Sequence, residues 1–228
     1  MPRPAGFLRL YEEALLLALR NEKGTVAASA MFEQAVGGAI LAELILEGRL
    51  KTVVDGRSTY AVVADPTPLG DDVLDACLAR VTTTSRRGKL ATWVQRFGGM
   101  KGLKHQVAAS LVRKGILRED EGRVLLLFTR RIYPELDPVH ERRIVERIEA
   151  AISSDTASVD PRTTVLIALA HHAGLLKVNI DRARLRARRD RVQSIIKGDA
   201  VGNATKQAVE ATQAAIFAAV IVPTIVAR

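Results

Sequence analysis

Apolar residues recur at helical spacing along most of the chain. Residues 8–20 carry leucines and Tyr11 on one face, whereas 30–47 is apolar on more than one face. A helix that is apolar nearly all round is normally buried, so the second segment is expected at the centre of the fold. Gly37 and Gly38 in its middle indicate a close approach of another backbone.

Two stretches change to the period of β-strands. Residues 50–54 and 59–63 are rich in β-branched side chains and flank Asp55-Gly56, a dipeptide typical of hairpin turns. A second hairpin is predicted further along, with 116–118 pairing with 123–128 across a turn at 119–122.

The second hairpin carries an unbroken apolar run that includes Leu125, Leu126, Leu127 and Phe128. A strand that is buried on one face should alternate apolar and polar residues. The run is therefore either covered on both faces or presented to a membrane or another subunit.

The remaining pattern is helical and shows no repeat or linker. Helices are predicted at 71–82, 103–113, 138–153, 161–176, 181–197 and 203–219. The fold class is therefore mainly α: one globular domain over 1–228, with buried central helices ringed by amphipathic helices, and two β-hairpins.

Neither terminus predicts a targeting signal or a membrane span. The first residues lack an apolar signal core. Residues 214–227 are the most apolar stretch, but they are too short to cross a bilayer and contain Pro223. We expect a buried C-terminal helix there and a cytoplasmic protein.

Composition and charge narrow the class of partner. An apolar fraction of 48% and a charged fraction of 26% are typical of a folded protein, and a single cysteine excludes a disulfide framework. The 34 basic residues exceed the 25 acidic ones, giving a net charge of +9. This excess favours an anionic partner, either nucleic acid or an anionic membrane surface.

Enzyme motifs are missing, and neither a catalytic residue nor a metal or cofactor site is predicted. His171 and His172 are neighbours on a helix and diverge by about 100°, so they cannot face one metal ion. Cys77 has no histidine close in sequence and is interpreted as a small core residue.

The glycine loop at 98–102 is the strongest candidate for a binding site. Gly99 and Gly102 allow the backbone to wrap an anion, and Lys101 and Lys104 add positive charge at the start of a helix. Both features favour a phosphate site, although an ordinary turn with solvated lysines has the same sequence signature.

The arginine-rich segment 181–197 has two interpretations. Leu185, Val192 and Ile196 form an apolar stripe with arginines on both sides, which is typical of an amphipathic helix packed on a core. The same arginines could also form an anion-binding surface.

A rival hypothesis is a winged-helix DNA-binding protein. Its recognition helix would be 103–113 and its wing the hairpin 116–128. That helix is rich in alanine, valine and leucine, which leaves few polar side chains to read base edges. Nucleic acid is therefore the less favoured partner.

A series of short motifs in a fixed order resembles the Golgi phosphoprotein 3 family. The motifs are Leu8-x-Leu10-x-Glu12-Glu13-x-x-Leu16-Leu17-x-Leu19, Gly38-x-x-Leu41-x-Glu43-Leu44-x-Leu46-x-Gly48-Arg49-Leu50, Leu74-Asp75, Trp93, Leu111-Val112-x-Lys114-Gly115-x-Leu117, Leu126-Leu127-Phe128 and Leu166-Ile167-x-Leu169-Ala170-His171. They span most of the chain, and the closest likeness is to a bacterial member.

The resemblance implies a non-enzymatic peripheral membrane protein that recognises phosphatidylinositol 4-phosphate and has a protruding apolar hairpin. The family's headgroup pocket uses a tryptophan and three arginines. The tryptophan and first arginine align with Ala28 and Gly37, whereas the other two arginines align with Lys101 and Lys104. The resemblance therefore implies an anionic phosphate site without an aromatic cover, on a protein whose hairpin inserts into the membrane or joins subunits.

Overall fold

The predicted mainly helical fold is confirmed. The computed structural model describes residues 7–20, 24–26, 31–124, 128–155 and 158–197. The elements in chain order are α1 (Leu10–Ala18), β1 (Leu19–Arg20), β2 (Thr25–Val26), α2 (Phe32–Leu46), β3 (Leu50–Asp55), β4 (Ser58–Val63), α3 (Asp72–Thr82), β5 (Gly88–Lys89), α4 (Leu90–Gly98), α5 (Leu103–Arg113), β6 (Asp120–Val124), β7 (Phe128–Ile132), α6 (Val139–Ser153), α7 (Pro161–His172), α8 (Leu176–Asn179), α9 (Arg182–Ala187) and α10 (Arg189–Lys197).

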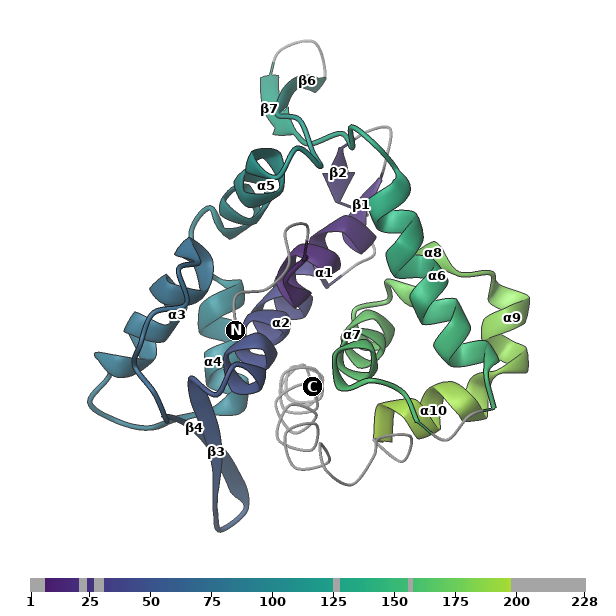
Figure 1. Cartoon of the computed structure of the whole chain (residues 1–228). Coiled ribbons are helices and arrows are strands. Elements are labelled where there is room, and N and C mark those ends of the chain that lie inside the picture. Colours follow the sequence, from purple (N-terminus) through teal and green to yellow (C-terminus); the bar gives the residue numbers. More distant parts are fainter. Residues whose placement is uncertain (1–6, 21–23, 27–30, 125–127, 156–157, 198–228) are drawn as a thin grey trace, which may run out of the picture.

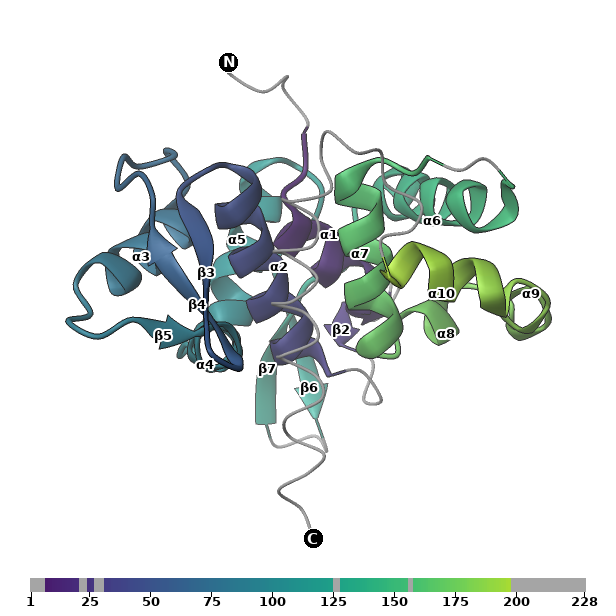
Figure 2. The same cartoon turned by 90° about the horizontal axis from the view of Figure 1, so that it is seen from below.

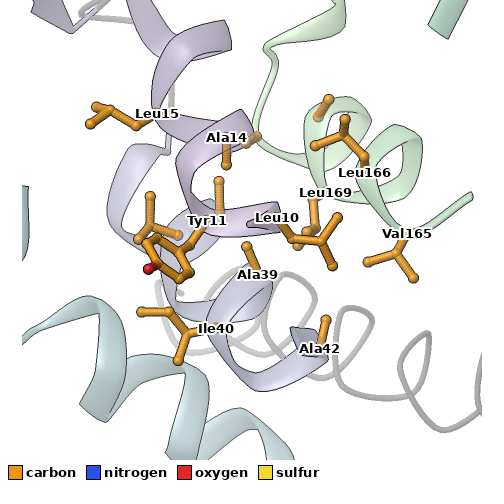
Figure 3. Packing of buried hydrophobic residues seen from close by; sticks show 14 of the residues in the cluster. Leu10, Tyr11, Ala14, Leu15, Ala39, Ile40, Ala42, Val165, Leu166 and Leu169 are labelled. Atoms are coloured by element: carbon orange, nitrogen blue, oxygen red, sulfur yellow. The ribbon is translucent and has the colours of Figure 1, made fainter. Parts of the chain in front are cut away.

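Helices α1 and α2 run through the middle of the molecule, with α3, α4 and α5 on one side and α6–α10 on the other (Figure 1). Helix α2 packs against α1, α4 and α7, and every residue from Ala35 to Ile45 is buried. Figure 3 shows Leu10 of α1 and Ala39 of α2 meeting Leu169 of α7. The prediction that 30–47 forms a buried central helix is thus confirmed.

The predicted close approach of another backbone to α2 is confirmed at Gly37. A Cβ atom at Gly37 would lie 2.3 Å from the carbonyl oxygen of Val94 and 2.8 Å from the amide nitrogen of Gly98. These are backbone atoms of α4, so any side chain at position 37 would force α2 and α4 apart. A Cβ at Gly38 would meet only the flexible end of Leu169, at 2.8 Å.

The first hairpin is confirmed and gains a third strand. Strands β3 and β4 pair antiparallel, with Asp55 opposite Ser58. Strand β5 adds to β4 through Tyr60 and Ala61.

The second hairpin has a different register from the predicted one. Strands β6 and β7 pair from Asp120 opposite Ile132 to Val124 opposite Phe128, so the expected turn at 119–122 belongs largely to β6. The reason is that Ile116 and Leu117 are core residues, 2% and 1% exposed, and their backbone pairs with the segment that follows β7. The hairpin projects from the body of the molecule (Figure 2).

The arginine-rich helix predicted at 181–197 is divided into α9 and α10 at Arg188. The Nε atom of Arg188 donates a hydrogen bond of 3.0 Å to the carbonyl oxygen of Ile152, and one terminal nitrogen donates to Ser153 and Asp155. The break therefore lets this side chain satisfy carbonyl groups at the end of α6. Similarly, the helix predicted at 161–176 ends at His172 and resumes as α8 after Gly174, whose φ is +76°.

The C-terminal helix predicted over 203–219 and 214–227 lies outside the described residues. Within the residues that are described, no helix has both the length and the apolar character that a bilayer crossing requires.

Buried carboxylates connect the central helices. Glu43 on α2 is fully buried and accepts hydrogen bonds from the Leu10 amide at 2.8 Å and from both terminal nitrogens of Arg162, at 2.8 and 3.0 Å. Glu12 on α1 is also fully buried and accepts from the hydroxyl of Ser110 and the ammonium group of Lys114. These bonds tie α1 to α2, α5 and α7.

A third buried carboxylate, Glu13, pairs with Arg147 of α6 at 2.8 Å. Burial raises the pKa of Glu13, and the charge of Arg147 opposes that rise. Acidic residues in the first turn of a helix are often solvated, but Glu12 and Glu13 are buried. They connect α1 to α5 and α6.

The network makes Glu43 a sensitive position. We expect Glu43→Gln to lower the free energy of unfolding by about 3 kcal/mol, because Arg162 would be left without its carboxylate partner in a largely buried position. Urea unfolding followed by circular dichroism measures this loss. The matched control is Glu149→Gln, which removes the partly exposed pair with Arg184 and should cost less than about 1 kcal/mol. Equal losses in the two variants would contradict a structural role for the network.

Candidate functional site

The candidate phosphate site lies where α4 gives way to α5. Helix α4 ends at Gly98, and Gly102 enters α5 with a φ of +74°, a left-handed conformation that favours glycine. The Leu103 amide is already bonded to the carbonyl oxygen of Met100, and the Gln106 amide to that of Gly102. The glycine loop is thus a tight helix entry.

A cavity of about 310 Å³ opens beside this entry. Its lining comes from β2, the start of α2, the end of α4 and the start of α5: Val26, Phe32, Glu33, Gly98, Met100, Gly102, Leu103, Lys104 and His105. Lys104 and Gly102 are therefore the predicted site residues that line it. Gly99 and Lys101 belong to the same turn but do not line the cavity.

Lys101 and Lys104 do not share a helical face, although their spacing of three residues in a continuous helix would place them on one. Helix α5 begins at Leu103, so Lys101 precedes it in the turn and is exposed. Convergence of the two ammonium groups on one phosphate would depend on the length of two flexible side chains rather than on helix geometry.

His105 is a site residue that sequence reasoning missed. Its ring nitrogen Nδ1 lies 2.8 Å from the hydroxyl of Tyr133, the residue that follows β7. Tyr133 is itself anchored, because its amide donates to the carbonyl oxygen of Gly24. The cavity and the base of the hairpin are thus in direct contact. The signal in the sequence that could have identified it is its position in the first turn of the helix that follows the glycine loop.

Of the two positions aligned with the family's tryptophan and first arginine, the structure describes only the second. Ala28 lies outside the described residues. Gly37 faces the backbone of α4 with no space for a Cβ atom, so an arginine cannot stand there in this packing. Phe32, half-buried at the start of α2, is the aromatic residue that lines the cavity instead.

Strands β6 and β7 flank the predicted apolar run in the sequence. Val124 and Phe128 form the last pair of the β6–β7 ladder, and Leu125, Leu126 and Leu127 between them lie outside the described residues, as does the side chain of Phe128. The ladder begins at Asp120 and Ile132, close in sequence to the core residues Ile116 and Leu117, and ends at the pair Val124 and Phe128.

Helix α5 packs its apolar face against the core, which limits what the helix can present to a DNA base. Leu103, Val107, Ala108, Ser110 and Leu111 are buried against the core. Arg113, at the other end of the helix, pairs with Asp72 at 3.1 Å. The exposed polar side chains of the helix are His105, Gln106 and Arg113, and two of these have protein partners in Tyr133 and Asp72.

Two other candidate residues behave as core or boundary groups. Cys77 is fully buried, and burial raises the pKa of its thiol to about 12. The Nδ1 atom of His172 lies 2.7 Å from the carbonyl oxygen of Ala168 within α7. Across the described ranges, no group of three or more histidine, cysteine or acidic side chains is placed to hold a metal ion.

Glu135 is an unexpected acidic group at the base of the hairpin. It bridges to Leu117 through the backbone, and neither of its carboxylate oxygens has a hydrogen-bond partner among the described residues. Burial, together with the nearby charges of Glu141 and Asp137, raises the pKa of Glu135 to about 7.

Comparison with known proteins assigns the chain to a family. The Golgi phosphoprotein 3 (GPP34) family matches residues 10–212, which is most of the chain. The protein therefore belongs to the Golgi phosphoprotein 3 family, as the ordered motifs predicted.

Similar curated proteins include two fungal ones, both named vacuolar protein sorting-associated protein 74. The protein from Schizosaccharomyces pombe is 26% identical over 172 residues, which cover 67% of this chain and 50% of the relative. The protein from Eremothecium gossypii is 25% identical over 202 residues, covering 75% of this chain and 60% of the relative. The chain thus spans one half to three fifths of the length of these relatives.

Glu135 gives a prediction about pH. Because its folded pKa is raised, the folded state holds a proton that the unfolded state releases, so stability falls as pH rises from about 5 to about 8. Glu135→Gln should remove this pH dependence and should be more stable than the wild type at pH 8 by about 1 kcal/mol. This figure is smaller than the pKa shift alone would give, because partial exposure to solvent screens the charge.

Thermal unfolding of both proteins between pH 5 and pH 8 tests this expectation. Glu146→Gln, an exposed substitution of the same type on α6, controls for the change in net charge. A difference between wild type and Glu135→Gln that stays constant with pH would contradict the role given to this carboxyl group.

Proposed function

We propose that the protein is a non-enzymatic peripheral membrane protein, acting as one domain, that binds the phosphate of an anionic lipid headgroup at the start of α5. Lys101 and Lys104 supply positive charge, and Gly99 and Gly102 shape the turn. Leu125–Leu127 and Phe128 at the hairpin tip insert into the bilayer or join subunits.

The observation that carries this proposal is the cavity at the entry to α5. It brings Lys104 and His105 together at a helix N-terminus, where the backbone favours negative charge. Glu33 on its rim opposes an anion, so a phosphate would depend on the cations of the turn to outweigh it. A net charge of +9 supports attraction to an anionic surface over a longer range.

The contact between His105 and Tyr133 supports a joint role for cavity and hairpin. The two rings lie 5.7 Å apart between centroids, so the phosphate site adjoins the strand that leads to the apolar tip. A single orientation on a membrane could then engage a headgroup and bury apolar side chains together.

We further propose that the headgroup is a phosphoinositide such as phosphatidylinositol 4-phosphate, bound with modest selectivity. Lysine is a point charge and lacks the bidentate fork of arginine. Position 37 has no room for an arginine, which removes one source of headgroup discrimination.

The first prediction concerns the lysines. Lys101→Gln/Lys104→Gln should weaken binding to vesicles containing phosphatidylinositol 4-phosphate by about tenfold or more, since each basic residue near the surface contributes about 1 kcal/mol. Vesicle sedimentation at physiological salt measures the affinity, and neutral phosphatidylcholine vesicles should bind neither protein.

The control removes the same charge elsewhere. Arg142→Gln/Arg143→Gln changes two exposed arginines of α6 that do not line the cavity. Equal weakening in both double variants would reduce the effect to net charge and contradict a site. Duplex DNA assayed in parallel tests the rival hypothesis, which predicts stronger binding to DNA than to vesicles.

The second prediction concerns the hairpin tip. Leu126→Asp/Phe128→Asp should weaken vesicle binding by about tenfold, or reduce the mass of an oligomer in analytical ultracentrifugation, because charged groups at the tip oppose apolar contact. Val54→Asp/Ser58→Asp adds the same charge at the turn of β3–β4, where Val54 is 73% exposed, and should leave both measurements unchanged. Loss of the folded state in the first variant would instead make the run part of the core.

A further inference from the structure

A second cavity lies on the other side of the central helices, among α7, α8, α9 and α10. Its volume is about 500 Å³, and its lining comes from the end of α7, from α8 and from the arginine-rich segment. These helices lie across α1 and α2 from α5, so the cavity is separate from the one at the glycine loop (Figure 1).

The polar side of this cavity is cationic. Lys177, Arg182, Arg186 and Arg189 line it together with His171, and no aspartate or glutamate does. None of the four cations forms an ion pair with a carboxylate of the described residues. Burial and the neighbouring His172 and Lys177 lower the pKa of His171, which is consistent with positive surroundings. Like charges held together repel one another, so an anion in the cavity would be stabilised by all of them.

The other arginines of the segment have different partners. Arg184 pairs with Glu149 at 2.7 Å, and Arg188 bonds to carbonyl groups at the end of α6 and to Asp155. Neither acid of the segment lines the cavity: Asp181 caps α9 through the amides of Ala183 and Arg184, and Asp190 is not part of the lining. Arg184 and Arg188 therefore pair with acidic side chains, whereas Arg182, Arg186 and Arg189 line the cavity.

Apart from Gln193, the remaining lining of the cavity is apolar. Leu176 and Val192 are 2% and 3% exposed, and Leu185 is half-buried against the same core. A wholly polar ligand such as free phosphate would satisfy the cations but leave this surface without a partner. A ligand that carries an aliphatic group would cover it.

We propose that this cavity binds a small amphiphilic anion, with a phosphate group held by Arg186, Arg189 and their cationic neighbours, and a short aliphatic chain against Leu176, Leu185 and Val192. The volume is within the range of small-molecule sites rather than of macromolecular interfaces. Phosphate suits the site because guanidinium groups bind its oxygens in a bidentate manner.

Monomeric decyl phosphate is the probe, titrated calorimetrically into the full chain below its micelle concentration. We expect one molecule to bind per chain, and decyl phosphate to bind at least about tenfold more tightly than inorganic phosphate, because only the former covers the apolar surface. Decyltrimethylammonium, with the same chain and the opposite charge, should not bind.

Two variants locate the ligand. Arg186→Gln/Arg189→Gln should weaken decyl phosphate binding by about tenfold or more, whereas Arg142→Gln/Arg143→Gln, with the same loss of charge on α6, should change it less than about twofold. Gln193→Trp keeps every cation and obstructs the cavity, since Gln193 is part of the lining, and it should also abolish binding. Circular dichroism and thermal unfolding establish that each variant is folded.

The source of the ligand and the independence of the site are tested together. Vesicles containing phosphatidic acid present the same chemistry within a membrane, so weaker vesicle binding by Arg186→Gln/Arg189→Gln would identify a membrane lipid, and an effect confined to decyl phosphate would identify a free amphiphile. Lys101→Gln/Lys104→Gln should bind decyl phosphate normally, which separates this proposal from that for α5. Absence of decyl phosphate binding, or binding that survives both Arg186→Gln/Arg189→Gln and Gln193→Trp, would overturn it.

Discussion

The buried carboxylates of Glu12 and Glu43 constrain the arrangement of the central helices. A charge removed from water is tolerated only if partners surround it, and these two groups find theirs on several elements. Arg162 brings α7 to the junction of α1 and α2, and Lys114 brings the end of α5 to α1. A shift of any one helix along its axis would leave a buried charge unpaired.

Helix α5 connects these buried carboxylates to the candidate membrane site. Lys114, just beyond the end of α5, is held by Glu12, while Gly102 sets the direction in which the helix begins. Ile116 and Leu117 follow immediately and are buried, so the hairpin leaves the core from a defined point. The cavity at the helix entry and the base of the hairpin then meet at His105 and Tyr133.

The same network affects how charge is distributed over the molecule. Glu12, Glu13 and Glu43 lie inside, paired with Lys114, Arg147 and Arg162. These three cations therefore neutralise the buried carboxylates, and the excess of basic residues lies elsewhere on the molecule. The cavity among α7–α10 collects part of it, because Lys177 and three arginines line it without an acidic residue, whereas the cavity at the start of α5 has Lys104 together with Glu33. The difference matters chemically, because arginine offers a planar fork of donors and lysine a single point charge.

The sequence by itself determined the helical class, the buried centre and the family, because helical periodicity and short ordered motifs are local properties that neighbouring residues encode. It also identified the close packing at Gly37, since glycine weakens an apolar helix and is favoured there when another backbone lies against it. Tertiary structure decided the register of the second hairpin and the break at Arg188, because each depends on a contact with a distant segment: Leu117 with Glu135, and Arg188 with the end of α6. The separation of Lys101 from Lys104 likewise depended on where α5 begins. A helical wheel could place Arg182, Arg186 and Arg189 on one side of a stripe, but only the packing of α8 and α9 brought Lys177 and His171 to the same cavity, since residues so far apart in sequence become neighbours through the core they share.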